Sequence, residues 1–532
     1  MVASWMKPSA WALEPEESNF APTTSRWSNK DMDPVPPLLR TWSTWNYVTY
    51  WISDAVNLPT WELASSMLAI GLSWRQALAA IAVGHTIIAM VMVLNGTVGA
   101  RLHVGFPVLN RSSFGFWLSY FSVISRVVLA LFWFGILTFS GSECIDQMIQ
   151  AIWPSATRIP NRLSLSAGIT SNGMMCYFIF WVIQFPIMLI SPQRIRWFFL
   201  IKAVIVPIAW IAILIWAMVK VPPSISLDNQ RASVSGSVFA WAWLSSMNSA
   251  LGNYATLAVN IPDFTRYARN ERAQYIQAIL IPTLFTLTGF VGIAVTSAGK
   301  VLYGETLWDP TTLIAHWDRA PKFFAALSFL IATLGTNISA NSLSAANDMM
   351  VLFPRYINIR RGQILCAILG GWALAPWEIL ASAPGFLNFM GGYTIFLGPF
   401  AGIMVADYWL VHKGKVDVAA MYDPNGRYRY WNGINWRTVV ALLFSVSPSF
   451  PGLISSINSS IRIGDLNHIF DIAWLYGFFV AGFIHWSLSK LFPAHETFID
   501  TAIIDLYEHD QDTDANSHSH NHSSDEKVIG GG

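Results

Sequence analysis

The sequence predicts an all-α membrane protein with twelve transmembrane helices. Of its 532 residues, 54% are hydrophobic and only 12% are charged, whereas about one quarter of the residues of a soluble protein are charged. Apolar stretches close to the ~20 residues that cross a bilayer recur along the whole chain. The alternating segments of about ten residues that a membrane β-barrel needs are not found. We therefore expect helices that span a lipid bilayer.

Charged or Pro/Gly/Asn-rich breaks separate the apolar segments. The cores of the twelve segments lie at 45–70, 76–97, 115–142, 174–191, 197–219, 237–261, 275–298, 322–348, 363–381, 384–410, 437–457 and 468–491. This pattern divides the chain into an N-terminal tail (1–43), a twelve-helix domain (44–492) and a C-terminal tail (493–532). The last part of that tail, "EHDQDTDANSHSHNHSSDEKVIGGG", is polar and low in complexity, so we expect it to be disordered.

The positions of the basic residues predict the orientation of the chain in the membrane. Most of the 32 Lys+Arg residues fall in the tails and in loops on one side, with clusters such as "RYARNER", "RYINIRR" and "GRYRY". Cytoplasmic loops carry such an excess, so we expect both termini in the cytoplasm of a plasma-membrane protein. The first forty residues contain no apolar run, so no cleavable signal peptide is predicted. A net charge of +1 points neither to nucleic acid nor to an acidic partner.

The sequence gives no sign of an enzyme, a metal centre or a cofactor. The three cysteines, Cys144, Cys176 and Cys366, are scattered and match no metal-ligand spacing and no disulfide framework. Outside the region of the C-terminal tail, the histidines are dispersed and form no pair at helical spacing, and no nucleophile stands beside a base. The tail motif "HSHNH" could bind a metal weakly, but without fixed geometry.

Two segments five places apart are interrupted. The first reads "SDAVNLPTWELASS", in which Asn57 and Pro59 break the helix because proline removes a backbone donor. The sixth reads "MNSALGNYATL", in which Gly252 and Asn253 mark a second weak point. Paired interruptions suggest a five-plus-five inverted repeat whose unwound helices bind a substrate and an ion at mid-membrane. Ordinary membrane-helix kinks are the alternative.

The eighth segment, "ATLGTNISANSLSAAND", is unusually polar. Small and polar residues, among them Ala332, Gly335, Thr336 and Asn341, fall broadly on one side of the predicted helix. A carboxamide presents a donor and an acceptor, which match the N–H/C=O edge of a lactam or imide. Trp133 in segment 3 could stack on such a flat ring, although a lipid-facing role is the alternative.

Six motifs carry a family resemblance: "NLPTWELASSML", "GFPVLNRSSFG", "NYATLAVNIPDFTRYAR", "GTNISANSLSAANDM", "FLGPFAGIMVADYW" and "INWR". In this order they resemble the nucleobase-cation-symport family 1, especially its fungal Fur-like branch of uracil, allantoin and uridine permeases, over roughly residues 31–493. The resemblance implies a leucine-transporter-like fold of twelve helices. It also implies a bundle of segments 1, 2, 6 and 7 and a scaffold of segments 3, 4, 8 and 9.

The resemblance also implies roles for individual residues. A planar substrate would lie between Trp133 and either Tyr254 or the adjoining Asn253. Asn341 would hold the edge of the ring, and Asn57 stands just before the break of segment 1.

Further implied roles concern the gates. Phe389 and Met390 correspond to an outer gate in segment 10. Asp263 and Arg266, together with the N-terminal stretch "NKDMDPVPPLLRTW", correspond to elements that close the cytoplasmic side.

Two departures from the family pattern concern substrate and cation. The family usually has a glutamine where this chain has Leu137, so either another group replaces the hydrogen bond of that glutamine or the preferred substrate differs from uracil. Sodium-coupled relatives use two neighbouring hydroxyls in segment 8, whereas here Gly335 precedes Thr336. We therefore expect coupling to protons rather than sodium, with Ala332, Gly335 and Thr336 at the coupling position.

Ionisable residues in or near the segments are candidate proton carriers, because each costs free energy in lipid. They are Glu62, Arg126, Glu143, Lys202, Asp348 and Glu378. Glu62 and Lys202 are the two that we include with the coupling residues. Location at a membrane interface is the alternative explanation for some of them.

Taken with the resemblance, these features predict a secondary active transporter that imports a small neutral nitrogen heterocycle with protons. The expected substrates are uracil, allantoin, uridine or related compounds. A thiamine or nicotinamide riboside carrier is the alternative substrate class, although no carboxylate stands at the predicted pocket positions to balance the charge of thiamine. A non-transporting nutrient receptor is the alternative of another class.

Overall fold

The structure is a computed structural model that describes residues 11–13, 27–190, 192–227, 233–458 and 460–504. Within these ranges the chain is helical, with isolated β-bridges and no strand. This confirms the predicted all-α class. The predicted disordered tail and its "HSHNH" motif lie outside the described residues.

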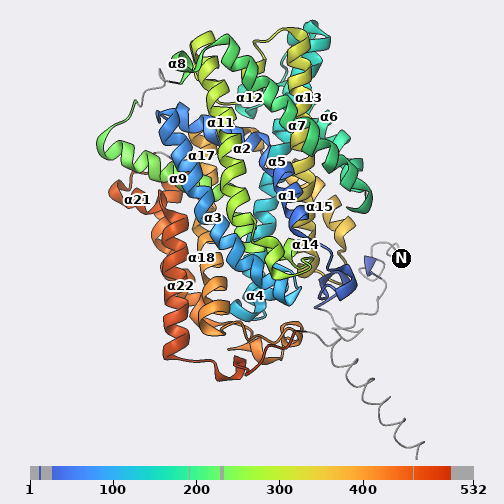
Figure 1. Cartoon of the computed structure of the whole chain (residues 1–532), viewed down its shortest axis with the longest axis vertical. Helices are drawn as coiled ribbons and strands as arrows, with labels where there is room; N and C mark the ends of the chain where they lie inside the picture. The colour runs from blue at the N-terminus through green and yellow to red at the C-terminus, as the bar shows by residue number, and fades with distance from the viewer. Residues whose placement is uncertain (1–10, 14–26, 191, 228–232, 459, 505–532) are drawn as a thin grey trace, which may run out of the picture.

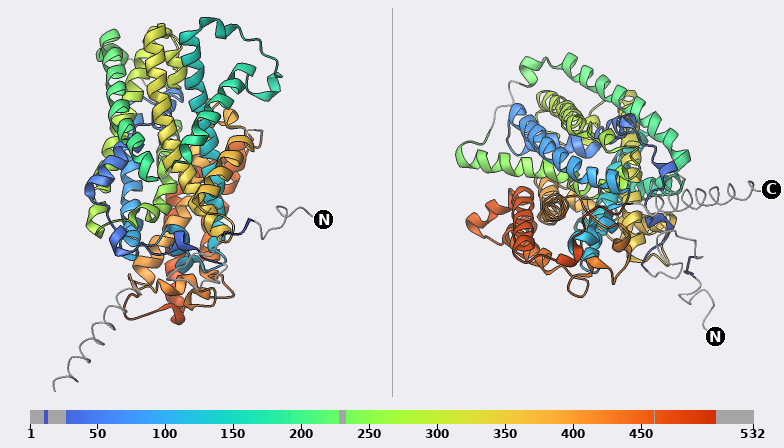
Figure 2. Two further views of the ribbon diagram at one scale, coloured as in Figure 1. Left: turned by 90° about the vertical axis from the view of Figure 1, so that its right-hand side faces the viewer. Right: turned by 60° about the horizontal axis from the view of Figure 1, so that its bottom comes forward.

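The long helices run roughly along the longest axis of the molecule (Figures 1 and 2). Below, the upper end is the end near α12 in Figure 1, and the lower end is the end near α4. The helices of the first half are α1 (Thr44–Ala55), α2 (Leu58–Ala69), α3 (Trp74–Leu102), α4 (Phe106–Phe114), α5 (Ser119–Ile152), α6 (Ser171–Met188), α7 (Pro192–Lys220), α8 (Pro223–Ser226), α9 (Gly236–Asn260), α10 (Pro262–Thr265) and α11 (Gln277–Tyr303).

The second half continues with α12 (Pro310–Ile314), α13 (Arg319–Thr336), α14 (Leu343–Leu352), α15 (Ile359–Trp372), α16 (Pro376–Ile379), α17 (Ala383–Gly392), α18 (Thr394–Val405), α19 (Trp436–Val446), α20 (Phe450–Ile457), α21 (Asn467–Phe470) and α22 (Ala473–Leu491). Two π-helical turns, η8 (Asn337–Ser342) and η9 (Ala406–Val411), extend α13 and α18.

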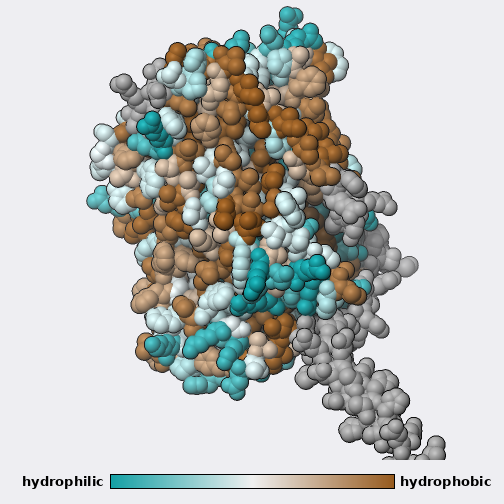
Figure 3. All heavy atoms as spheres, in the orientation of Figure 1, coloured by the Kyte–Doolittle hydropathy of each residue, from teal (hydrophilic) through white to brown (hydrophobic). Residues whose placement is uncertain are grey.

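The surface and the helix lengths fit a membrane protein. In the described part of the chain, eight helical stretches are long and apolar enough to cross a bilayer, or nine if the bent pair Gly464–Phe470 and Ala473–Leu491 forms one span. The count of twelve stays a prediction. Figure 3 shows apolar side chains over most of the visible face, with hydrophilic groups gathered near the lower end and at the top. Exposed apolar side chains such as Ile208 and Ile211 on α7 suit contact with lipid.

Both predicted helix interruptions are present. Segment 1 is divided between α1 and α2, and the side chain of Asn57 caps α2 by accepting a hydrogen bond from the Thr60 N–H at 2.8 Å. Pro59 occupies the first turn of α2, where its missing N–H leaves no helical bond unmade. In α9 the departure from helical geometry falls at Tyr254, whose φ and ψ are −124° and 18°. This is one residue beyond the predicted Gly252–Asn253 pair.

The helices form the two groups that the family resemblance implies. In one group α2 and α3 pack on each other and on both α9 and α11, and in the other α5 packs against α6, α13, α14 and α15. A third group joins α18, α19 and α22. Small residues allow close packing: a Cβ at residue 84 would lie 2.8 Å from that of Ala250, so Gly84 lets α3 approach α9.

Candidate functional site

The π-helical turn η8 lies in the middle of the eighth predicted segment. A π-turn widens a helix by one residue and is frequent at functional sites. It carries Asn337 and Asn341, of which Asn341 is 7% exposed. The Asn341 amide donates to the Asn337 side-chain oxygen at 2.9 Å. Its own carbonyl oxygen accepts no hydrogen bond from the described residues, so it is an acceptor available to a ligand.

Neighbouring helices hold Asn337 in place. Its amide donates to the backbone oxygen of Phe134 at 3.2 Å and to the Gln184 side-chain oxygen at 3.0 Å. Gln184 in turn donates to the Thr138 hydroxyl at 2.8 Å. A buried network with its donors satisfied fixes side-chain positions. Asn337 therefore orients Asn341, a role that the sequence analysis missed.

Trp133 lies beside the predicted gate residue. Its ring centroid is 5.6 Å from that of Phe389 and 6.4 Å from that of Tyr393. Tyr393 donates a hydrogen bond to the backbone oxygen of Gly252 at 2.7 Å, which ties α17 to α9 next to its interruption. Met390 is fully buried on α17. The structure therefore brings Trp133, the gate and the interruption of α9 together.

Leu137 lies one helical turn beyond Trp133 and is buried. The adjacent Thr138 belongs to the polar network around Asn337. The effect of Leu137 on substrate choice stays a prediction.

The interruptions of α1 and α9 meet through Tyr254. Its hydroxyl donates to the Asp54 carboxylate at 2.8 Å, and its ring packs 4.5 Å from that of Phe285. The Asn57 amide donates to the backbone oxygen of Asp54 at 2.6 Å and to the Tyr254 hydroxyl at 3.2 Å. By contrast, the amide nitrogen of Asn253 is buried without a hydrogen-bond partner among the described residues. Of the two alternatives, Asn253 is the one with a free polar group.

Asp54 is a second residue that the sequence analysis did not assign to the site. It stands in the quoted segment "SDAVNLP", and it is 2% exposed in the structure. An acidic residue just before a helix break was the available signal, because an intramembrane carboxylate is a functional candidate by default.

Lys202 reaches the predicted coupling position from α7. The side chain is 1% exposed, and its ammonium donates to the Thr336 hydroxyl at 2.7 Å. A Cβ at residue 335 would lie 2.5 Å from Cδ and 3.3 Å from Nζ of Lys202, so a glycine there makes room for the lysine. The ammonium also interacts electrostatically with Asp54. Ala332 is fully buried one turn before Thr336.

The lower end is closed by polar contacts between the two helix groups. Arg126 on α5 forms a 3.0 Å ion pair with Asp348 on α14 and donates to the backbone oxygen of Thr256 on α9 at 3.0 Å. The Ser344 hydroxyl accepts from Arg126 at 2.6 Å and from Asn260 at 3.1 Å. These contacts join α5 and α14 of one group to α9 of the other.

The predicted closure residues lie next to this junction. Asp263 accepts a hydrogen bond from the Phe106 N–H at 2.9 Å, and Arg266 donates to the backbone oxygen of Asp31 at 3.3 Å. A cavity of only about 10 Å³ remains between them, beside Met350. At the upper end a cavity of about 320 Å³ is lined by Glu62, among others.

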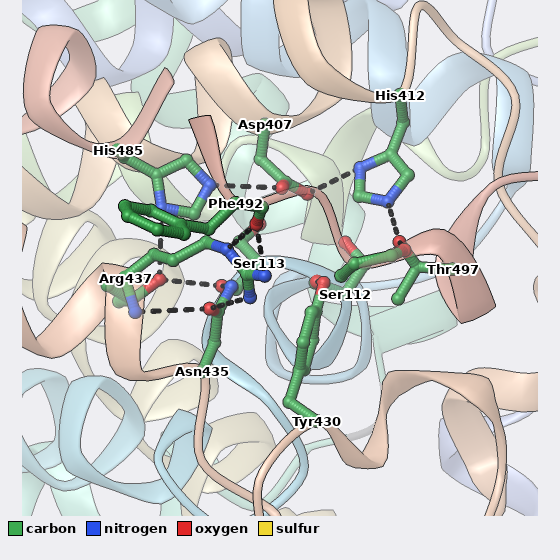
Figure 4. A network of polar contacts seen from close by, with 12 residues as sticks. Ser112, Ser113, Asp407, His412, Tyr430, Asn435, Arg437, His485, Phe492 and Thr497 are labelled. Carbon is green, nitrogen blue, oxygen red and sulfur yellow. Dashed lines mark hydrogen bonds and ion pairs between the residues drawn. The ribbon is translucent and has the colours of Figure 1, made fainter. Parts of the chain in front are cut away.

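A separate polar network links η9, α19 and α22 of the third helix group to neighbouring loops (Figure 4). The Asp407 carboxylate contacts His485 Nε2 at 3.1 Å and His412 Nδ1 at 3.2 Å. His412 Nε2 lies 3.0 Å from the Thr497 hydroxyl, and His485 Nδ1 lies 3.1 Å from the Thr438 hydroxyl.

The same network anchors neighbouring loops through backbone oxygens. Arg437 donates to the Phe492 oxygen at 2.7 Å, and Asn435 donates to the Ser113 oxygen at 2.8 Å. Tyr430 donates to the Ser112 oxygen at 2.5 Å. Arg437 therefore fastens the segment after α22 to α19, and Asn435 and Tyr430 fasten the loop before α19 to α4.

Known proteins resemble this chain over most of its length. The family described as "Permease for cytosine/purines, uracil, thiamine, allantoin" matches residues 34–477. An uncharacterised permease of Schizosaccharomyces pombe is 38% identical over 507 residues, covering 94% of this chain and 89% of that protein. The allantoin permease of Saccharomyces cerevisiae is 36% identical over 487 residues, covering 88% of this chain and 76% of that protein.

A solved structure shares the fold. It is that of Mhp1, a nucleobase-cation-symport-1 family transporter in a closed conformation with bromovinylhydantoin bound. The TM-score is 0.69, with 88% of this chain and 97% of that chain covered. At 22% identity the likeness concerns the fold, and it confirms the fold implied by the sequence motifs.

Proposed function

Because this chain belongs to the family of permeases for cytosine/purines, uracil, thiamine and allantoin, we propose that it imports a small neutral nitrogen heterocycle together with protons. Its relatives are named permeases, which move a substrate without converting it, so the chain is a multi-pass membrane transporter and not an enzyme. Uracil, allantoin, uridine or a related compound is the proposed substrate. Coupling to protons and location in the plasma membrane are also parts of the proposal.

The polar groups left free on η8 and α9 support a lactam or imide substrate. The Asn341 carbonyl oxygen is an available acceptor because none of the described residues donates to it, and the bond from its amide to Asn337 orients it. The Asn253 amide nitrogen is a buried donor without a partner among the described residues. A ring that offers one N–H and one C=O satisfies both groups, and Trp133 supplies a flat aromatic face.

The observation that carries proton coupling is the position of the Lys202 ammonium. It occupies the space beside Gly335 and Thr336 where sodium coupling would need a second hydroxyl. The positive charge of the protonated lysine in this space opposes the binding of a sodium ion. When a lysine in this position gains or loses a proton, a positive charge appears or disappears there, as it does when a sodium ion binds or leaves.

The difference between the two ends of the molecule supports alternating access. The lower end is closed by the Arg126–Asp348 pair and its neighbours, while the upper end has an open cavity. We propose that the lower end is cytoplasmic, in agreement with its basic loops, and that the membrane is the plasma membrane. Opening of the lower end then requires the contacts between the two helix groups to separate.

The test is uptake by the purified protein in proteoliposomes. Counterflow with radiolabelled uracil, allantoin, uridine, thiamine and nicotinamide riboside identifies the substrate and separates a transporter from a receptor. We expect counterflow of at least one neutral heterocycle, and its loss in Trp133→Ala with partial retention in Trp133→Phe. Binding without counterflow for every compound would favour the receptor, and counterflow of thiamine or nicotinamide riboside alone would favour the vitamin or riboside carrier.

A further inference from the structure

A basic cluster lies at the lower end of the molecule, where the turn after η9 meets α3. The turn carries Lys413 and Lys415, and both side chains are exposed. Arg101 in the last turn of α3 lies beside them, because a Cβ at residue 414 would be 4.0 Å from Arg101 Nη1. These three residues, named the basic cluster below, therefore connect α3 to the end of η9.

The two lysines have no acidic partner. Neither ammonium forms a hydrogen bond or an ion pair with a residue that the structure describes. The acidic side chains of the neighbouring segments are already engaged, Glu271 by Arg101, Asp417 by Arg427, and Asp407 by His412 and His485. The basic cluster therefore carries positive charge that the protein itself does not balance.

Lys413 also has an unfavourable backbone conformation. Its φ is 53°, in the left-handed region that glycine usually occupies just after a helix ends. Backbone hydrogen bonds hold the turn in this shape, from the Gly414 N–H to the Tyr408 oxygen at 2.8 Å and from the Lys415 N–H to the His412 oxygen at 3.0 Å. A lysine at a position suited to glycine points to a role for its charge.

The side chains next to the basic cluster mark the edge of the membrane. Trp409 is partly exposed, and its indole N–H donates to the Leu94 backbone oxygen at 3.4 Å. The Arg101 guanidinium lies over the Trp409 ring, 5.2 Å from its centroid. Leu94 on α3 and Leu410 on η9 are exposed apolar side chains. Tryptophan between apolar and basic side chains is typical of the membrane–water interface, so the basic cluster lies at the level of the lipid headgroups.

We propose that the basic cluster binds the headgroup of an anionic phospholipid, with the phosphate between Arg101 and the two lysines and the acyl chains along Leu94 and Leu410. The lower end is the proposed cytoplasmic end, and anionic lipids are concentrated in the cytoplasmic leaflet. A bound lipid bridges α3 and η9, which belong to different helix groups. The site contains none of the central residues, so the inference does not depend on what is transported.

The test compares two lipids of different charge. Binding of short-chain phosphatidylserine and of short-chain phosphatidylcholine, which has no net charge, is measured on the purified full-length protein in a neutral detergent. We expect phosphatidylserine to bind more tightly. The double variant Lys413→Gln, Lys415→Gln should weaken its binding about 25-fold, from about fivefold for each lysine.

A single variant separates the charge of Lys413 from its place in the turn. Lys413→Gly should weaken the binding of phosphatidylserine without lowering the thermal unfolding midpoint, because glycine adopts the left-handed conformation more readily. Unchanged binding of phosphatidylserine in this variant and in the double variant would overturn the proposal.

The matched control is the double variant Arg355→Gln, Arg360→Gln, which removes two exposed positive charges from the turn before α15 and from its first turn. We expect it to bind phosphatidylserine like the wild type. Equal losses in the two double variants would show only a general attraction to basic surfaces and would overturn the proposal. Equal binding of the two lipids would do the same, as would full competition by inorganic phosphate at the same concentration, which indicates a site for a soluble anion.

Discussion

Asn341 is the residue on which the recognition of a ring edge depends. Its carbonyl oxygen accepts no hydrogen bond from the described residues, while its amide donates to Asn337 and so fixes the orientation of the side chain. Replacing it by alanine removes the acceptor and leaves a ligand N–H unpaired, at a cost of about 1–3 kcal/mol or about 5- to 150-fold in affinity. We expect Asn341→Ala to lose apparent affinity for the substrate in uptake assays at normal surface expression. The control is Asn172→Ala at the start of α6, and an unchanged affinity in Asn341→Ala would remove Asn341 from the site.

The sequence left open whether Tyr254 or Asn253 contacts the substrate, and variants of the two residues distinguish the alternatives. If its ring stacks on the substrate, Tyr254→Phe keeps the ring and should bind normally. The structure instead engages its hydroxyl with Asp54, so the variant leaves that buried carboxylate without its donor. We expect a lower transport rate with little change in substrate affinity, while Asn253→Ala should weaken affinity. Transport kinetics of both variants measure this, and the reverse pattern would make Tyr254 the substrate residue.

At the scale of elements, the Arg126–Asp348 pair holds α5 and α14 together at the lower end. Both side chains are almost completely buried in the protein, at 1% and 0% exposed. Loss of one partner of such a pair costs about 3–5 kcal/mol because the other charge stays buried. We expect Asp348→Asn to lower the thermal unfolding midpoint strongly. Asp417→Asn breaks the partly exposed pair with Arg427, worth about 0–1 kcal/mol, and is the matched control. Equal losses would contradict this account.

The Asp407–His412 contact makes the anchoring of the segment after α22 sensitive to pH. Burial alone would lower the pKa of His412, but the charge of Asp407 outweighs it, and the pKa is raised above its ordinary 6.5. Protonated His412 therefore stabilises the folded state fully below about pH 6.5, and this contribution disappears as pH rises through the raised value.

We expect His412→Gln to lower the unfolding midpoint at about pH 6 and to have less effect at about pH 9. Thermal unfolding in detergent across this range measures the difference from the wild type. His316→Gln at the upper end is the control. A difference that grows with pH would contradict the sign of this linkage.

For the whole molecule, the sequence predicted the all-α membrane class and the location of the two helix interruptions. Both could be predicted because hydropathy and interruption by proline or glycine are local signals. Asn57 and Pro59 marked the first break, and the second fell one residue beyond the predicted pair. The sequence did not predict the π-turn that carries Asn341 or the support of Asn337, because both depend on packing between helices distant in the chain. The sequence showed that Gly335 stands where sodium-coupled relatives have a hydroxyl. Only the structure shows that the Lys202 side chain fills the space beside it.

The most direct test of the central claim is the ion that drives accumulation. In proteoliposomes with an imposed pH gradient, acidic outside and without sodium, we expect the wild type to accumulate its heterocycle above the external concentration. A sodium gradient without a pH gradient should drive none. Lys202→Met should lose the accumulation driven by the pH gradient, because Lys202 is the group proposed to release and regain the proton. Accumulation driven by sodium alone, with no response to the pH gradient, would contradict proton coupling and the role given to Lys202.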